Sequence, residues 1–155
     1  MKKKIIYTIL LFIWMLVIFM FSSQNGTNSQ KTSDVITDKV VSTIEHVKKE
    51  KLDKNDTSLI VRKLAHFIEY FILGILTYLT ISNYNIKNPL ICGILICIMY
   101  ASLDEAHQIF SIGRSPKILD VIIDSCGSVL AILIKKHTKP NKKYVKNVDF
   151  ISYLW

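Results

Sequence analysis

Apolar residues are gathered in long blocks along this chain, with polar segments between them. The first block, residues 5–21, follows three lysines and is followed by no small-residue cleavage site, which favours an uncleaved membrane helix over a secretory signal. A helix needs about 20 mostly apolar residues to cross a bilayer, so polar flanking turns would complete the shorter blocks. The pattern predicts an all-α integral membrane four-helix bundle with helices at about residues 5–21, 59–82, 89–108 and 116–134.

An insert at residues 22–58 separates the first two apolar blocks and begins with a polar stretch. Farther on it carries apolar residues spaced four, four and three apart: Ile36, Val40, Ile44 and Val47. This spacing is typical of one amphipathic helix that lies on the membrane or packs on the bundle. We therefore expect one transmembrane domain at residues 1–134, including this extracytoplasmic insert, and a basic tail at residues 135–155 that could dock on anionic lipid.

The basic residues are unevenly distributed and predict the orientation. Residues 1–4, 83–88 and 135–155 together hold ten lysines and one aspartate, whereas the rest holds ten basic and eleven acidic residues. Because cytoplasmic loops are enriched in Lys and Arg, we expect both termini and the tail to be cytoplasmic. Orientation accounts for the formal net charge of +8, and no nucleic-acid-binding motif accompanies it, so no nucleic-acid partner is expected.

Local signals predict helix ends and close packing in the second half of the chain. Pro89 suits the first turn of a helix, and Ser115 and Pro116 suit the N-cap and first position of the last one. Gly127 and Ala131 on that last helix are small enough for close contact with a neighbouring helix.

Ionisable residues occupy the outer halves of three predicted helices. Arg62, His66 and Glu69 are spaced i, i+4 and i+7 and share one face. With a rise of about 1.5 Å per residue, Asp104 and Asp120 lie at the height of Glu69, about 20 Å from the cytoplasmic ends. A charge inside a bilayer costs at least about 2.5 kcal/mol, so these groups need partners, water or a metal.

Two interpretations of this cluster are open. In the structural one, cations and acids form an ion-pair network of Arg62, Lys63 and Arg114 with Glu69, Asp104, Glu105, Asp120 and Asp124. In the functional one, the same groups line a polar cavity open to the outer leaflet. The variety of polar types in so short a chain favours the cavity.

The polar motifs resemble those of the VanZ-like family of small bacterial membrane proteins. "RKLAHFIEYFILG" at residues 62–74 is similar to the family pattern R-K-x-x-H-x-x-E-Y-x-x-L-G, and "SLDEAHQIFSIGRSPKILDVIIDSCGSVLA" at residues 102–131 to D-E-x-x-Q-x-F, G-R and D-V-x-x-(D/N)-x-x-G. "FSSQ" at the end of the first helix also fits, whereas "SIGR" lacks the proline that is frequent before the glycine. The resemblance implies four transmembrane helices in a multi-pass protein of the bacterial cell membrane. It further implies an association with resistance to glycopeptide antibiotics, teicoplanin in particular, but no established reaction.

One hypothesis is an enzyme that modifies an anionic cell-envelope lipid or its precursor. The candidate catalytic residues are His66, Glu69, Asp104, Glu105 and Asp120. The candidate substrate-binding residues are Arg62, Lys63, Tyr70, Gln108, Arg114 and Asp124. Arginine suits bidentate contact with phosphate, and a histidine held by a carboxylate suits a general base. Alternatively, His66, Glu69, Asp104 and Asp120 could bind a divalent metal.

The other hypotheses involve no chemistry by this chain. It could bind and shield an envelope lipid, a lipid-linked cell-wall precursor or the glycopeptide antibiotic itself. It could also be a small transporter subunit, which four helices would form only as a homo-oligomer, and no inverted repeat supports this.

Overall fold

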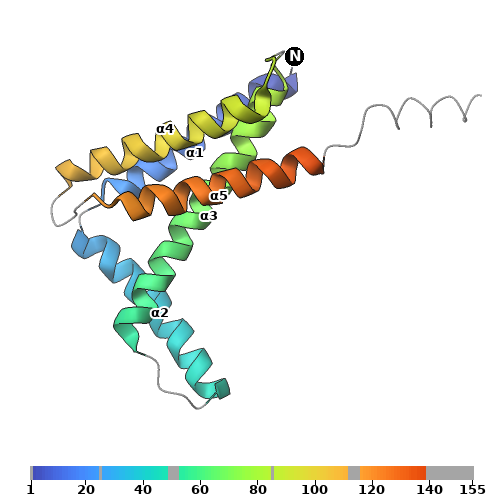
Figure 1. The fold of residues 1–155 in the computed structure, drawn as a ribbon. Coiled ribbons are helices and arrows are strands. Elements are labelled where there is room, and N and C mark those ends of the chain that lie inside the picture. Colours follow the sequence, from blue (N-terminus) through green and yellow to red (C-terminus); the bar gives the residue numbers. More distant parts are fainter. Residues whose placement is uncertain (1, 25, 49–52, 85, 112–115, 139–155) are drawn as a thin grey trace, which may run out of the picture.

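The computed structural model describes residues 2–24, 26–48, 53–84, 86–111 and 116–138, with backbone alone at 26–32, 44–45 and 47–48. The described chain is entirely helical, which confirms the all-α prediction (Figure 1). The elements are α1 (Lys2–Ser22), α2 (Gly26–Lys48), α3 (Lys54–Ser82), α4 (Pro89–His107), the short 3₁₀ helix η1 (Gln108–Phe110) and α5 (Ile118–His137).

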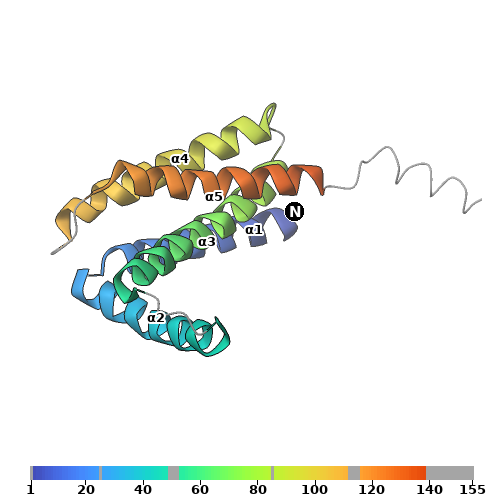
Figure 2. The ribbon, with the colours of Figure 1, turned by 60° about the horizontal axis from the view of Figure 1, so that its bottom comes forward.

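Helix α3 is the centre of the fold, because it packs against α1, α2, α4 and α5. Its second half packs against the layer of α4 and α5, with α1 beside it on the other side, and its first half projects beyond these helices with α2 alongside (Figures 1 and 2). The start of α1, the α3–α4 connection and the end of α5 lie at one end of the molecule (Figure 1). These are the segments whose lysines predicted a common side of the membrane.

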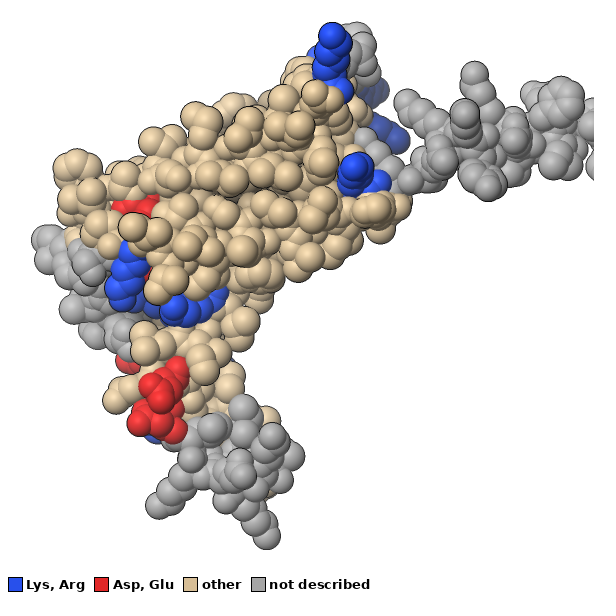
Figure 3. Space-filling model, in the orientation of Figure 1, with Lys and Arg blue, Asp and Glu red and all other residues tan. Residues whose placement is uncertain are grey.

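Three helices are long and apolar enough to cross a bilayer: α1, α3 and the continuous α4–η1 segment. Helix α5, predicted as a fourth span, does not meet this description, because Asp120, Asp124 and its terminal lysines interrupt its 20 residues. On the visible face of the bundle, Lys and Arg alone lie at one end, and Lys or Arg together with Asp or Glu lie at the other (Figure 3). The surface between these two ends carries no charged side chain. Many large apolar side chains are exposed on this bundle, among them Phe12, Met99 and Leu119. A surface of this kind is typical of contact with lipid.

Helices α3 and α5 approach so closely that two glycines are required. A Cβ on Gly74 would lie 2.4 Å from the backbone oxygen of Ser128, and one on Gly127 would lie 2.5 Å from that of Phe67. Ala131, also at this crossing, is fully buried. The expected close packing through Gly127 and Ala131 is therefore confirmed, and Gly74 on α3 is its counterpart.

Helix α1 is fastened to the bundle by side chains that donate to backbone carbonyls. Trp14 Nε1 donates to the Glu69 carbonyl at 2.9 Å, which ties α1 to the ionisable part of α3. The Tyr100 hydroxyl of α4 donates to the Met15 carbonyl at 2.6 Å, and Thr80 Oγ1 donates to Tyr7 at 3.0 Å. Such bonds fix helix register where apolar packing alone is weakly directional.

Helix α2 packs on α3 through small side chains next to the predicted apolar face. Its buried side chains are Ser33, Thr37 and Val41, whereas Ile36 is 47% exposed. The small polar side chains allow α2 to approach the polar start of α3, where Lys54 and Asp38 form an exposed ion pair at 2.9 Å. The helix predicted from the apolar spacing is thus confirmed. Whether the face that carries Ile36 lies on the membrane stays a prediction.

The predicted start of α5 is also corrected. Pro89 lies in the first turn of α4, as expected. Pro116, however, precedes α5, whose N-cap is Lys117, and Ser115 lies outside the described residues. The backbone N–H of Lys117 donates to the Glu105 carboxylate of α4. A carboxylate from a neighbouring helix, rather than a local Ser-Pro signal, therefore caps the start of α5.

Candidate functional site

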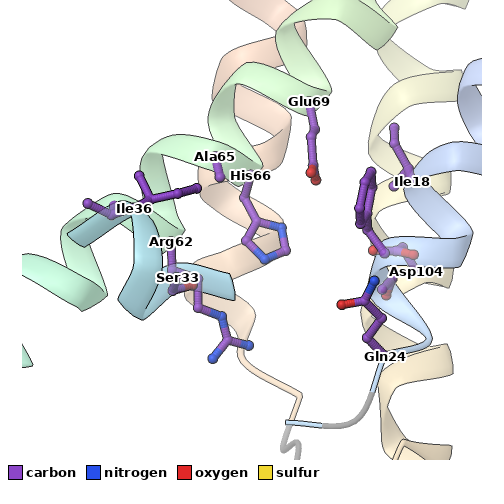
Figure 4. Close-up of a pocket in the computed structure, with 12 residues that line it drawn as sticks. Ile18, Gln24, Ser33, Ile36, Arg62, Ala65, His66, Glu69 and Asp104 are labelled. Atoms are coloured by element: carbon purple, nitrogen blue, oxygen red, sulfur yellow. The ribbon is translucent and has the colours of Figure 1, made fainter. Parts of the chain in front are cut away.

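A polar pocket of about 250 Å³ lies where the end of α1, α2, the first half of α3 and the end of α4 meet (Figure 4). Ser22 and Gln24 reach it from the end of α1, and Ser33 and Ile36 from α2. Phe21, Ile18, Val61 and Ala65 supply apolar wall. We call this cavity the polar pocket.

Helix α3 supplies the ionisable wall of the polar pocket. Arg62, His66 and Glu69 all line it, as their shared helix face predicted. Arg62 and His66 extend from α3 into the space, with Glu69 farther along the helix toward Ile18 (Figure 4). Arg62 forms no ion pair with any described residue, which leaves its guanidinium available to a ligand.

Asp104 faces the pocket from α4, on the opposite wall (Figure 4). Its side chain is only 4% exposed and lies beside Ser22, Tyr70 and Gln108. Among the described groups, none forms a well-aligned hydrogen bond with Asp104 Oδ1 or the buried Tyr70 hydroxyl. The structure thus brings Tyr70 and Gln108 to Asp104, one layer behind the pocket wall.

Asp124 of α5 lies behind His66. Its Oδ1 is 3.8 Å from His66 Nδ1, a distance for electrostatic attraction rather than a hydrogen bond. Asp124 is 1% exposed and also within electrostatic reach of Glu69, Asp104, Glu105 and Asp120. An ionised carboxylate at this distance from a ring nitrogen favours the protonated form of the imidazole electrostatically.

Besides Tyr70, Gln108 and Asp124, three further predicted site residues among those described do not line the polar pocket. Glu105 is buried and caps α5. Lys63 and Asp120 line a second cavity of about 30 Å³ between α3 and the start of α5. Its wall is completed by Leu59, Arg62, His66 and Lys117, and we call this cavity the basic cleft. Arg114 lies outside the described residues.

Neither the structural ion-pair network nor the four-ligand metal site finds much support in the described ranges. Arg62 and Lys63 form no ion pairs there, so the structural network is not built around them. Nor do three or more His, Cys, Asp or Glu side chains converge there in a way that could hold a metal ion. The four-ligand metal site envisaged from the spacing is therefore not formed by His66, Glu69, Asp104 and Asp120.

Sequence reasoning missed the contribution of α2. Ser33 and Ile36 line the pocket because α2 folds back on α3, and no motif marks them. Ser22 and Gln24 were recognisable, since "FSSQ" was expected at this end of the bundle.

The comparison with known families adds the decisive observation. A sequence model described as VanZ/LLP1 matches residues 7–138, which is most of the chain. The chain belongs to the VanZ/LLP1 family. The match covers most of α1, all of α2, α3, α4, η1 and α5, and every residue of the polar pocket, so the resemblance carried by the polar motifs is confirmed. No curated protein and no solved structure gave a significant match.

The VanZ/LLP1 assignment and the three apolar helices together indicate a membrane protein of this family. The cluster of arginine, histidine and carboxylates is thus placed in a membrane protein, where ionisable groups in membrane-spanning helices are candidates for a functional site.

Proposed function

We propose that this VanZ/LLP1 protein crosses the bacterial cell membrane four times, with both termini cytoplasmic and the polar pocket open to the outer leaflet. Helix α5 supports this as the fourth span because its acids turn inward, with Asp124 buried, while Ile122, Leu130 and Ile134 are exposed on its outer side. Lysines begin α1 and end α5, and these two helix ends lie at the same end of the molecule (Figure 1). The positive-inside rule assigns that end to the cytoplasm.

In this orientation the pocket acts on an anionic cell-envelope lipid or a lipid-linked cell-wall precursor. The observation that carries the proposal is the Arg62–His66–Glu69 face of α3, set opposite Asp104 and backed by Asp124. Arg62 binds a phosphate oxygen, for which a guanidinium is suited, and no residue in the described ranges forms an ion pair with it. The apolar outer surface of the bundle accommodates the acyl or prenyl chain.

The proposed chemistry is proton transfer at the headgroup. His66, which lies beside Asp124, accepts a proton from a water molecule whose oxygen attacks the phosphorus atom held by Arg62, and Asp124 stabilises the resulting imidazolium. The bond between phosphorus and the headgroup oxygen breaks, and Glu69 on the same wall or Asp104 on the opposite wall gives a proton to this leaving oxygen. Modification of an envelope lipid or precursor would alter the target or the membrane anchoring of teicoplanin, which links the pocket to glycopeptide resistance.

A second candidate is a non-catalytic binding protein that shields the same lipid. Ser22 favours it: this hydroxyl lines the pocket, yet it is 3% exposed and forms no hydrogen bond with His66. Ser22 is therefore not positioned as an activated nucleophile, and in this alternative the pocket would serve recognition alone.

The test compares cells that hold equal amounts of the wild-type protein, Glu69→Gln or Asp56→Asn. Asp56 is an exposed acid of α3 outside the pocket and is the matched control. Mass spectrometry of envelope lipids and cell-wall precursors should show a modification with wild type and control that Glu69→Gln lacks, and teicoplanin susceptibility should change in parallel. Unmodified lipids with a phospholipid co-purifying only with wild type and control would establish the binding protein instead. Identical lipids and susceptibility in all three strains would refute both.

A further inference from the structure

The basic cleft gathers cations, two of which the proposed mechanism does not use. Its wall carries Arg62, Lys63 and Lys117 together with one acid, Asp120. None of the three cations forms an ion pair with a carboxylate in the described parts of the chain, Asp120 included. Like charges held close together repel one another, so an anionic ligand in the cleft would stabilise this group of side chains.

Arg62 and His66 lie between the basic cleft and the polar pocket, because both side chains line both cavities. They are one helical turn, or about 6 Å, apart along the axis of α3. A phosphate that Arg62 holds beside His66 is therefore next to the lysines of the cleft. A second phosphate joined to the first through a shared oxygen would reach these lysines directly.

The polar pocket is less suited than the cleft to this second phosphate. Beyond Arg62 and His66, the pocket adds the acids Glu69 and Asp104, but no further cation among its described lining residues. The cleft adds two lysines instead, and lysine binds phosphate as a point charge. With a volume of about 30 Å³, the cleft takes a compact group such as one phosphate.

The exposed surface around the cleft indicates where the lipid chain lies. Leu59 in the wall of the cleft is 54% exposed, and Ile60 and Leu64 beside it on α3 are exposed as well. The polar pocket, by contrast, lies between α1, α2, α3 and α4. A lipid chain is therefore accommodated on the side of the cleft. The phosphate next to the chain then lies at the cleft lysines, and the terminal phosphate lies at Arg62 and His66.

We propose that the basic cleft is a second phosphate site and that the substrate is a lipid diphosphate with a free terminal phosphate, such as a prenyl diphosphate. Lys63 and Lys117 bind the phosphate that carries the chain, and Arg62 binds the terminal phosphate beside His66. This inference rests on the proposed function and specifies its substrate class.

The bridging oxygen is the leaving oxygen in this substrate. Water that gives a proton to His66 forms a new bond to the terminal phosphorus. The bond from this phosphorus to the bridging oxygen breaks, and the bridging oxygen takes the proton that Glu69 or Asp104 supplies, while Lys63 and Lys117 stabilise the remaining charge of the lipid monophosphate. Inorganic phosphate is the other product, and the proton on His66 passes through solvent to restore the acid.

The test measures binding to the purified full-length protein in detergent by native mass spectrometry. The probes are farnesyl diphosphate and farnesyl monophosphate, which share their chain and differ by one phosphate. The wild type should bind the diphosphate about tenfold more tightly, as expected for one charge-assisted contact. Lys63→Gln and Lys117→Gln should each lose this preference. Lys136→Gln, at the far end of α5, is the charge-matched control and should keep it.

The two lysine variants should fold normally. Lys63 and Lys117 are exposed, and Lys117→Gln keeps the backbone N–H that donates to Glu105. Inorganic diphosphate, which lacks the chain, should bind more weakly than farnesyl diphosphate. Equal binding of these two would assign the site to free diphosphate and overturn the lipid substrate.

The other outcomes separate this inference from the proposed function. Equal binding of the two farnesyl probes, weakened in both cases by Arg62→Gln, would overturn the second phosphate site and leave a phosphate-binding pocket. A preference for the diphosphate that both lysine variants retain would place the second phosphate outside the cleft and overturn the inference as well. Binding that Arg62→Gln weakens no more than Lys136→Gln does would overturn both the inference and the proposed function.

Discussion

The close approach of α3 and α5 makes Gly74→Ala a direct test of how the site is held together. A Cβ at position 74 would lie 2.4 Å from the backbone oxygen of Ser128 and 2.8 Å from its Cα, whereas ordinary contact begins at 3.4 Å. The obstructing atoms are backbone, so they cannot rotate away, and the helices must separate by about 1 Å. Overpacking of this kind costs about 1–3 kcal/mol.

The gain in helix propensity opposes this loss only in part. Alanine is favoured over glycine inside a helix by up to about 1 kcal/mol, so the net loss is about 1–2 kcal/mol. That corresponds to a fall in the unfolding midpoint of roughly 3 to 8 °C. Separation of α3 from α5 should also lengthen the 3.8 Å contact between His66 and Asp124, so lipid modification should fall along with stability.

Gly93→Ala is the matched control, since a Cβ at position 93 would meet its nearest neighbour, Ile132 Cδ1, at an ordinary 3.5 Å. The assay is thermal unfolding of purified protein in one detergent, followed by circular dichroism at one scan rate because membrane proteins often unfold irreversibly. Gly93→Ala should match the wild type or exceed it slightly. If Gly74→Ala proves as stable as Gly93→Ala, the close crossing of α3 and α5 is refuted.

Three further substitutions test separate parts of the account. Glu105→Gln weakens the hydrogen bond from the Lys117 N–H, so the free energy of unfolding should fall by about 1 kcal/mol and the unfolding midpoint with it. A variant of normal stability that no longer modifies lipid would instead make Glu105 catalytic. Trp14→Phe removes the bond to the Glu69 carbonyl and should cost about 1 kcal/mol in the same assay, whereas an unchanged midpoint would show that this bond does not hold α1. Val41→Asp places a charge on the buried face of α2, so a protease should cleave α2 faster while the rest of the bundle stays intact. Cleavage of α2 at the wild-type rate would contradict the packing of α2 on α3.

The helices and the convergence of polar groups were predictable because both follow from simple periodicity. Long apolar blocks can only be helices in a membrane, and a spacing of i, i+4 and i+7 placed Arg62, His66 and Glu69 on one wall. The rise per residue of a helix likewise predicted that Asp104 of α4 lies at the same height as Glu69 of α3. Family motifs and spacing thus located most of the polar pocket.

The remaining features depend on contacts between segments that are distant in sequence. The apolar spacing from Ile36 onward could not reveal that α2 buries Ser33 and Thr37, because that choice depends on the polar surface of α3. Glu105 looked catalytic because it follows Asp104 in a motif, yet one residue rotates a side chain by about 100° on a helix, which carries Glu105 to the start of α5. The separation of Lys63 and Asp120 into the basic cleft has the same origin.

The central claim is that the polar pocket carries out chemistry on a lipid headgroup. Its most direct test is purified protein in nanodiscs made from bacterial envelope lipids, with the lipids analysed by mass spectrometry over time. The wild type should produce an altered headgroup, and His66→Gln should do so 10²- to 10⁴-fold more slowly, as expected for loss of a general base, while the control Asp56→Asn proceeds at the wild-type rate. Lipids that stay unchanged with the wild type, or that change equally fast with His66→Gln, would contradict the claim.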